Sequence, residues 1–245
     1  MDLAARFTAA VAAETVDGPD DGHLLPERLA RAAARVLPVD GVGFSAQAGS
    51  RGRLPLGASS PDAERAERLQ FTTGSGPCLL AAGTGRPVFM LEEDLRRRWP
   101  VFADLLLSAT PFRAVVSLPG PQALTGTGAM DLFFVAPAAV AELGVFDALA
   151  VAGLVSSALS EAALWSTWSA ATGPDWLHSP AAERRAAVWQ AVALTGTALD
   201  VGSPAALALL RAHAYAGGRT VDSVAADMLS GRLRPTDVAD RPGAG

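Results

Sequence analysis

An arginine, a tyrosine and a second arginine recur at four-residue intervals near the C-terminal end, at Arg211, Tyr215 and Arg219. At this spacing Arg211 and Tyr215 share one face of a helix, and Arg219 follows just beyond its end. Guanidinium groups bind phosphate and an aromatic ring stacks on an unpaired base, so this set is suited to a phosphate backbone with an unpaired base. The alternative, in which Tyr215 packs in a core and the arginines only face solvent, fits the spacing about as well.

Cys78 is the only cysteine, which excludes an intramolecular disulfide. It follows Gly74-Ser75-Gly76-Pro77 at the start of an expected short helix, where a helix N-terminus can lower a thiol pKa and create a sensor thiol. The competing interpretation is a small residue packed beneath the turn. We favour the second, because free cysteine is among the most buried residue types.

Catalytic and metal-binding residues form no recognisable motif. The three histidines, His23, His178 and His213, are far apart, so the sequence predicts no metal site. Nucleophile-elbow, phosphate-loop and zinc-protease patterns are absent, and the glycines around Gly126-Thr127-Gly128 lack dinucleotide-binding spacing. We therefore expect a protein that is not an enzyme and that shows no evident cofactor.

Two other groups of residues are interpreted as structural. The run from Glu92 to Arg98 mixes acidic and basic residues, so a solvated surface with internal ion pairs is favoured over an anion site. Four tryptophans lie near an expected domain boundary, where packing between domains or protomers is favoured over a stacking platform. They are Trp165, Trp168, Trp176 and Trp189.

Composition limits the class of protein. A hydrophobic fraction of 50% and a charged fraction of 18% exclude a disordered chain. The net charge of -5 argues against nucleic-acid binding by the whole surface. Residues 1–177 carry a formal charge of -6 and residues 178–245 carry +1, so the positive charge is concentrated at the C-terminal end. The chain has no lysine, so every basic side chain is an arginine.

Targeting signals are not recognisable in the sequence. The first residues lack the basic and apolar regions of a secretory signal. The most apolar stretch, 143–160, contains Asp147 and reads more easily as a buried helix than as a membrane span. We expect a cytoplasmic protein without a membrane partner.

The chain divides into two parts that would position these residues. A helix and linker at 1–22 lead into an α+β domain at 23–168, with an antiparallel sheet flanked by helices. A linker at 169–179, a three-helix unit at 180–235 and a flexible tail at 236–245 follow. Alternating or short apolar runs predict strands at 39–48, 54–58, 88–91, 113–118 and 129–135, and helical spacing predicts helices at 61–70 and 141–168.

The three C-terminal helices have clear start and stop signals. Ser179-Pro180 and Ser203-Pro204 each offer a capping serine followed by proline, and Thr220 offers a third cap. Gly217-Gly218 and Gly231 end the second and third helices. A unit of this size is near the limit of independent stability.

The C-terminal part resembles the ANTAR domain, the three-helix RNA-binding module of transcription antitermination regulators. The resemblance lies in residues 185–196, 199–216 and 218–228. The preceding part resembles the GAF domain that accompanies ANTAR in actinobacterial proteins. Its best matching stretch is 67–79, followed by Gly85-Arg86-Pro87-Val88.

The resemblance implies a homodimeric regulator in which a sensor domain with an unidentified small-molecule ligand controls an RNA-binding output. ANTAR proteins bind paired hairpin loops in nascent mRNA, so no DNA partner is expected. Ala191, Ala214 and Ala225 match small positions at which helices pack closely. The residues that the resemblance assigns to RNA are Arg185, Gln190, Arg211, Tyr215 and Arg219.

The sequence departs from the ANTAR pattern at one place. Val192-Ala193 stands where the family usually has lysine or threonine followed by glycine. The change removes a possible phosphate contact and the room that glycine gives an approaching backbone. The alternative function is therefore a ligand-sensing or dimerisation module whose C-terminal helices no longer bind RNA.

Overall fold

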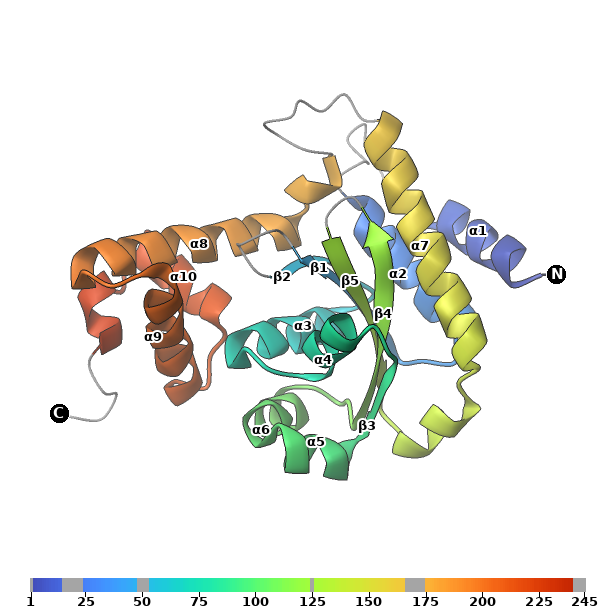
Figure 1. Ribbon diagram of the computed structural model, residues 1–245, viewed down its shortest axis with the longest axis horizontal. Coiled ribbons are helices and arrows are strands. Elements are labelled where there is room, and N and C mark those ends of the chain that lie inside the picture. Colours follow the sequence, from blue (N-terminus) through green and yellow to red (C-terminus); the bar gives the residue numbers. More distant parts are fainter. Residues whose placement is uncertain (1, 15–23, 48–52, 124–125, 166–174, 240–245) are drawn as a thin grey trace.

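The computed structural model describes residues 2–14, 24–47, 53–123, 126–165 and 175–239. Within them, an antiparallel sheet has the strand order β2-β1-β5-β4-β3 (Figure 1). The predicted α+β class with an antiparallel sheet is thus confirmed. The strands are β1 (Gly41–Gln47), β2 (Arg53–Ala58), β3 (Val88–Leu91), β4 (Ala114–Ala123) and β5 (Gly126–Phe134).

The hairpin of β4 and β5 is longer than the sequence predicted. The second of these strands was predicted to begin at residue 129, but β5 already begins at Gly126, which pairs with Ala123. The register of this hairpin shifts between Pro119 and Gln122, where proline cannot donate to the ladder. Residues 119–123 and 126–128 were missed because the apolar pattern that predicted the two strands does not extend to them.

The central strands divide their side chains between two cores, as the two-residue period of a strand requires. On β4, Val116 and Leu118 belong to one core and Val115 to the other. On β5, Leu132 faces the first core and Phe133 the second. Helices must therefore cover both faces of the sheet.

The first face is covered by α1 (Leu3–Ala13), α2 (Leu25–Val36) and α7 (Val145–Trp165). Glu14, just after α1, forms ion pairs with Arg31 at 2.5 Å and with Arg35 at 2.8 Å. These contacts connect α1 to α2. A long helix was expected from residue 141, but a 3-10 helix, η3 (Pro137–Glu142), precedes α7. Leu143 and Gly144 separate the two.

Helix α7 is long and apolar enough to span a membrane. Helices α8 (Pro180–Leu199) and α9 (Ser203–Ala216) meet the same test only when they are taken together, and they are bent by 106° relative to each other. One side of α7 packs on the sheet, with Val151, Val155 and Leu159 in the first core. The prediction of a buried helix at 143–160 therefore holds for this side alone, since 28% of the apolar stretch Val145–Ala163 is buried.

The second face is covered by α3 (Pro61–Thr73), α4 (Pro77–Thr84), α5 (Glu92–Arg98) and α6 (Pro100–Ala109). The Ser60 side chain caps α3 at the backbone N–H of Ala63. The helix ends at Gly74, whose φ of 67° is left-handed and favours glycine. The sequence placed this end near Gln70, and the additional turn contains Phe71 and Thr72.

Beside α3 lies the C-terminal unit of α8, α9 and α10 (Val221–Leu229) (Figure 1). The predicted caps at Ser179 and Thr220 are confirmed, since their side chains accept from Ala182 and Ser223. At the start of α9, however, the cap position is Gly202, and no side chain caps the helix.

The expected tail also contributes to the packing of this unit. A 3-10 helix, η5 (Pro235–Ala239), follows α10, and Val238 is buried in the same core as the three helices. Phe71 of α3 belongs to this core as well. The sheet domain therefore supplies an aromatic side chain to the interior of the C-terminal unit.

Candidate functional site

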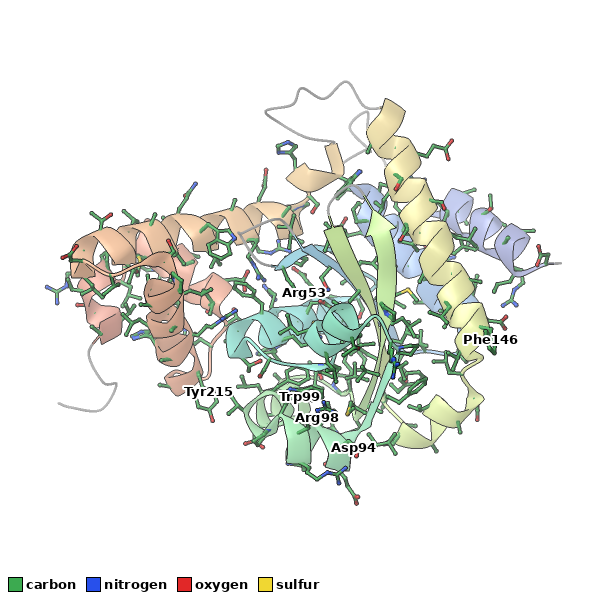
Figure 2. The ribbon with its side chains drawn as sticks, viewed as in Figure 1. Arg53, Asp94, Arg98, Trp99, Phe146 and Tyr215 are labelled. Atoms are coloured by element: carbon green, nitrogen blue, oxygen red, sulfur yellow. The ribbon has the colours of Figure 1, made fainter. Side chains whose placement is uncertain are left out.

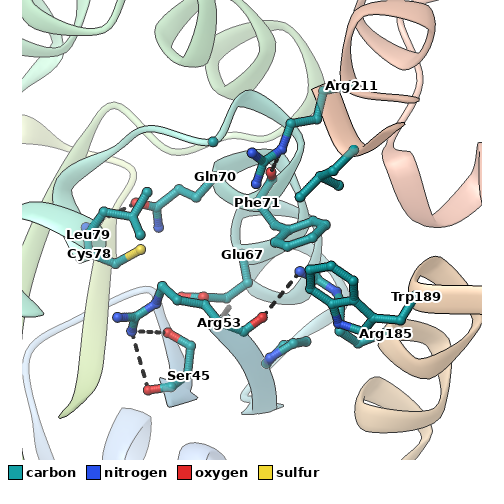
Figure 3. A pocket seen from close by; sticks show the side chains of 13 residues that line it. Ser45, Arg53, Glu67, Gln70, Phe71, Cys78, Leu79, Arg185, Trp189 and Arg211 are labelled. Atoms are coloured by element: carbon teal, nitrogen blue, oxygen red, sulfur yellow. Dashed lines mark hydrogen bonds between the residues drawn. The ribbon is translucent and has the colours of Figure 1, made fainter. Parts of the chain in front are cut away.

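A cavity of about 150 Å³ lies where the sheet domain meets the C-terminal helices (Figure 3). Strands β1 and β2 and helices α3 and α4 form one side, and helices α8 and α9 form the other. Its walls are mostly apolar, with side chains that include Pro55, Phe71, Leu79, Trp189 and Leu207. Three arginines and one carboxylic acid also line it, namely Arg53, Arg185, Arg211 and Glu67.

Phe71 holds two of these arginines. The guanidinium carbon of Arg185 lies 3.1 Å from the centre of the Phe71 ring, and that of Arg211 lies 4.9 Å from it. Nε of Arg211 also donates to the carbonyl oxygen of Phe71 at 3.0 Å. A cation over an aromatic face is stabilised by about 2 kcal/mol or more where water is excluded. Figure 3 shows both arginines reaching toward Phe71 from the C-terminal helices.

Arg185 is the most deeply buried of the three arginines, with 1% of the residue exposed. Its Nε lies 3.7 Å from Oδ1 of Asp222 in α10, and its Nη1 donates to the backbone carbonyl of Arg53 at 3.4 Å. Burial lowers the pKa of Arg185 to about 10, although Asp222 opposes this shift. The side chain thus links α8, α10 and β2.

Arg53 lies on edge strand β2 (Figures 2 and 3) and is only 9% exposed. Its Nη2 donates to the backbone carbonyl of Ser45 at 3.3 Å and to the Ser45 hydroxyl at 2.5 Å. Its Nε has no hydrogen-bond partner among the described residues. A buried donor of this kind is costly unless another acceptor meets it.

Glu67 of α3 is buried against the backbone of β1. A Cβ on Gly43 would lie 2.4 Å from Oε1 of Glu67, so only glycine leaves room for this carboxyl group. Burial, and then the nearby charge of Asp131, raise the pKa of Glu67 well above its usual value. The protonated form is therefore favoured.

Asp131 lies at the centre of the sheet on β5 and is fully buried. It accepts hydrogen bonds from Nε2 of Gln70 at 2.5 Å and from the Ser117 hydroxyl. The Gln70 amide oxygen in turn accepts from the backbone N–H of Cys78 at 3.1 Å. This network fixes the start of α4 against α3 and the sheet.

Replacing Glu67 with glutamine should make the protein less sensitive to high pH. A folded-state pKa raised above the unfolded value gives stability that is complete below the unfolded pKa and lost as pH rises through the folded pKa. Between the unfolded pKa and the higher folded pKa, the free energy of unfolding should fall by about 1.4 kcal/mol per pH unit from this group, and above the folded pKa this slope should end. Urea unfolding between pH 5 and pH 9 measures the slope.

The matched control for this prediction is Glu93→Gln, because Glu93 is exposed on α5. The control should keep the wild-type slope, while Glu67→Gln should flatten it. Equal slopes for Glu67→Gln and the wild type would show that the Glu67 carboxyl does not hold a proton in the folded protein.

Cys78 forms part of the cavity wall and is buried. Burial, and then the charge of Asp131, raise the pKa of its thiol well above the ordinary value. This direction is opposite to the one that a reactive thiolate needs. The structure therefore favours the interpretation of Cys78 as a small packed residue over a sensor thiol.

Of the residues assigned to RNA, the structure brings Arg185 and Arg211 together on Phe71 and leaves the others apart from them. Tyr215 is 45% exposed at the end of α9 (Figure 2), and Gln190 is exposed on α8. Arg219 donates to the carboxylate of Asp227 and, at 3.0 Å, to the carbonyl of Ser223 in α10.

Arg185 requires a correction to the sequence-based assignment. A side chain that is 1% exposed cannot contact RNA in the arrangement that the structure shows. Helical spacing gave no sign of this burial, because the covering residue Phe71 comes more than a hundred positions earlier in the chain.

The three alanines that match small positions of the ANTAR pattern, and the valine that departs from it at 192, lie in the core of the C-terminal helices. Ala191, Ala214 and Ala225 are each fully buried, as close helix packing requires. Val192 is buried in the same core, whereas Ala193 is exposed. A valine at 192 thus contributes packing inside the unit, and its side chain presents nothing to a phosphate.

The other candidates have structural environments. In the 92–98 run, Arg96 pairs with Glu92 at 2.8 Å and Arg97 with Asp94 at 2.5 Å, which confirms the predicted internal ion pairs. Trp176 is buried in the first core, and Trp189 lines the cavity. Trp168 and the Trp165 side chain lie outside the described residues, which contain no cluster suited to a metal ion.

Sequence reasoning missed Arg53, Glu67, Phe71, Asp131 and Asp222 as members of this site. Glu67 lies within the predicted helix at 61–70 and Phe71 just beyond it, and neither carries a local signal of a site. Asp131 does carry one, because a charged residue in the middle of an apolar strand must be paired when it is buried.

Comparisons with known proteins find matches among solved structures. No family model matches the chain, and none of the curated proteins matches it. Among solved structures, the chain is similar to the crystal structure of the GAF domain from Acinetobacter phosphoenolpyruvate-protein phosphotransferase. The two are 14% identical with a TM-score of 0.44, and the match covers 69% of this chain and 96% of that one.

Proposed function

We propose that the protein is a cytoplasmic sensory regulator, without catalytic activity, in which a GAF-like sheet domain controls an ANTAR-like RNA-binding unit. The observation that carries this proposal is the contact of Arg185 and Arg211 with Phe71. Arg211, a residue assigned to RNA, is held by the domain assigned to sensing, and the buried Arg185 packs on the same ring. A sensor domain can regulate RNA binding only if it contacts the RNA-binding unit, and this contact provides such a connection.

In the closed state that we propose, the C-terminal unit is docked on α3 and cannot bind RNA. Helix α3 contacts the C-terminal unit at three points. Phe71 contacts Arg185 and Arg211, and the Thr72 hydroxyl accepts a hydrogen bond from the backbone N–H of Val221 at 3.0 Å. If RNA binds only after release, its apparent dissociation constant rises in inverse proportion to the released fraction. Release would present Arg211 beside Tyr215, one helical turn away.

The proposed target is a hairpin loop in nascent mRNA, bound by a homodimer so that transcription continues past a terminator. Loop bases would stack on Tyr215, and arginine guanidiniums would contact phosphate or stack on bases. The chain has no lysine, so these contacts would come from arginine, whose planar group suits both.

The test is RNA capture by the full-length protein after crosslinking in cells, followed by filter binding of the enriched RNA. We expect binding to weaken steeply with salt, because phosphate contacts release counterions. The double variant Arg211→Gln with Tyr215→Ala should weaken binding by about tenfold or more, since a stacked base alone contributes about 1–3 kcal/mol.

The matched control is Arg97→Gln with Phe89→Ala, an exposed arginine and an exposed phenylalanine on α5 and β3. This variant should bind like the wild type. Capture of no RNA above background, or equal loss in both double variants, would refute the proposed RNA surface.

A second candidate function is dimerisation without RNA binding, and an apolar surface on the C-terminal unit favours it. Leu194 and Leu229 are 44% and 40% exposed and line a shallow apolar depression with Ala193 and Pro235. Under this alternative, Leu194→Glu should convert a dimer to a monomer in light scattering. An unchanged mass would exclude this surface as the dimer contact.

A further inference from the structure

We infer that the cavity between the sheet domain and the C-terminal helices binds a small organic acid with an apolar body. Its carboxylate would pair with Arg53, and its body would lie against residues of both units. This inference rests on the proposed sensory role and names the class of ligand that would be sensed.

The charges around the cavity favour an anion. Three guanidinium groups line it, from Arg53, Arg185 and Arg211, against the single carboxyl group of Glu67. Burial favours the neutral form of that carboxyl group, so it neutralises little of the positive charge. Asp222 beside Arg185 and Asp131 behind Glu67 offset part of this charge. The three guanidinium groups still outnumber these two carboxyl groups, so a carboxylate ligand would meet net attraction.

Arg53 provides the specific contact. It is nine-tenths buried and lines the cavity, and its Nε has no hydrogen-bond partner among the described residues. Its Nη2 is already occupied by Ser45, which fixes the orientation of the guanidinium group. A carboxylate oxygen would satisfy the unpartnered donor with a charge-assisted hydrogen bond.

The remaining walls define the rest of the ligand. Pro55 and Leu79 come from the sheet domain, and Trp189 and Leu207 come from the helical unit. A cavity of about 150 Å³ is of the size that holds one benzene molecule, so the ligand should have about six to ten non-hydrogen atoms. An aromatic or branched monocarboxylic acid fits these walls, whereas a nucleotide is too large and too polar.

The position of the cavity gives the ligand a regulatory consequence. Because its walls come from both units, a ligand that fills it gains contacts only while the units are together. It must then stabilise the closed state, and by linkage it must weaken any binding that requires release of the helical unit.

The experiment uses three probe acids, benzoate, phenylacetate and 4-methylpentanoate, each compared with its neutral amide at constant ionic strength. Calorimetric titration of the full-length protein gives the dissociation constant, and thermal unfolding gives the shift in Tm. We expect at least one acid to raise Tm by several degrees at saturation, and its amide to have no effect.

Two variants test the placement of the ligand. Arg53→Gln should weaken binding of that acid by about tenfold or more, because it removes a charge-assisted contact. Leu207→Phe keeps every charge and fills the cavity from α9, so it should also abolish binding even if Arg53→Gln folds poorly. Arg97→Gln, an exposed arginine on α5, is the control and should bind like the wild type.

The inference is overturned if none of the acids binds, if the amides bind equally well, or if Leu207→Phe leaves the dissociation constant unchanged. RNA capture is measured separately. Acid binding without RNA capture would refute the RNA output alone, and RNA capture without acid binding would refute the ligand class alone.

Discussion

Replacing Asp222 with alanine is expected to lower the free energy of unfolding by about 3–5 kcal/mol. Asp222 lies 3.7 Å from Nε of Arg185, and both side chains are almost fully buried. The substitution leaves the Arg185 guanidinium enclosed without its carboxylate. Burial already lowers the pKa of Arg185 to about 10 in the presence of Asp222, which shows how strongly this environment disfavours an isolated cation.

Urea unfolding of three further variants checks this explanation. Asp222→Asn keeps the shape and removes the charge, so it should lose most of the same stability. Arg185→Met combined with Asp222→Ala removes both charges and should recover a large part of the loss. Asp104→Ala breaks an exposed ion pair with Arg96 and should change stability by about 0.5 kcal/mol or less. If the double variant is no more stable than Asp222→Ala, the ion pair is not the cause.

Replacing Phe71 with alanine should cost about 3–5 kcal/mol and also separate the unfolding of the two units. The buried core of the C-terminal unit consists mainly of alanine and valine, and Phe71 is its largest buried apolar side chain within the described residues. The vacated space would join the existing cavity, so water could enter beside Val188 and Leu210. The helical unit should then melt at a lower temperature than the sheet domain.

Calorimetry and hydrogen exchange together measure this effect. The wild type should unfold in one cooperative transition, whereas Phe71→Ala should show an earlier transition with exchange beginning in α8, α9 and α10. Phe146→Ala is the matched control, because Phe146 is 87% exposed at the start of α7 (Figure 2). A single transition in Phe71→Ala would show that the two units do not depend on this side chain.

The sheet could be predicted because its signals are local. Val88–Leu91 was predicted with its observed bounds, and the apolar alternation around Val115 and Phe133 correctly placed two central strands. Proline and serine signals also located the start of α8. Each of these signals depends on neighbours within a few residues.

The site could not be predicted in the same way, because its contacts join distant parts of the chain. The hydrogen bond from Arg211 to Phe71 spans 140 positions. Helical spacing correctly placed Arg211 one turn before Tyr215, but it could not show which partner covers the arginine. Glu67 is similar, since its burial depends on the absence of a side chain at Gly43 on a different element.

We propose that the sheet domain restrains the arginines of the C-terminal unit through Phe71. This restraint is tested most directly by the affinity of the full-length protein for its captured RNA in Phe71→Leu. Leucine preserves most of the buried volume and removes the aromatic face beneath both guanidiniums.

We expect Phe71→Leu to bind RNA about tenfold more tightly than the wild type, because more of the protein is released. The dependence on salt should stay the same, because the released unit makes the same phosphate contacts in both proteins. Phe146→Leu should match the wild type in both respects. Equal or weaker RNA binding by a folded Phe71→Leu variant would contradict the claim that this contact restrains the output.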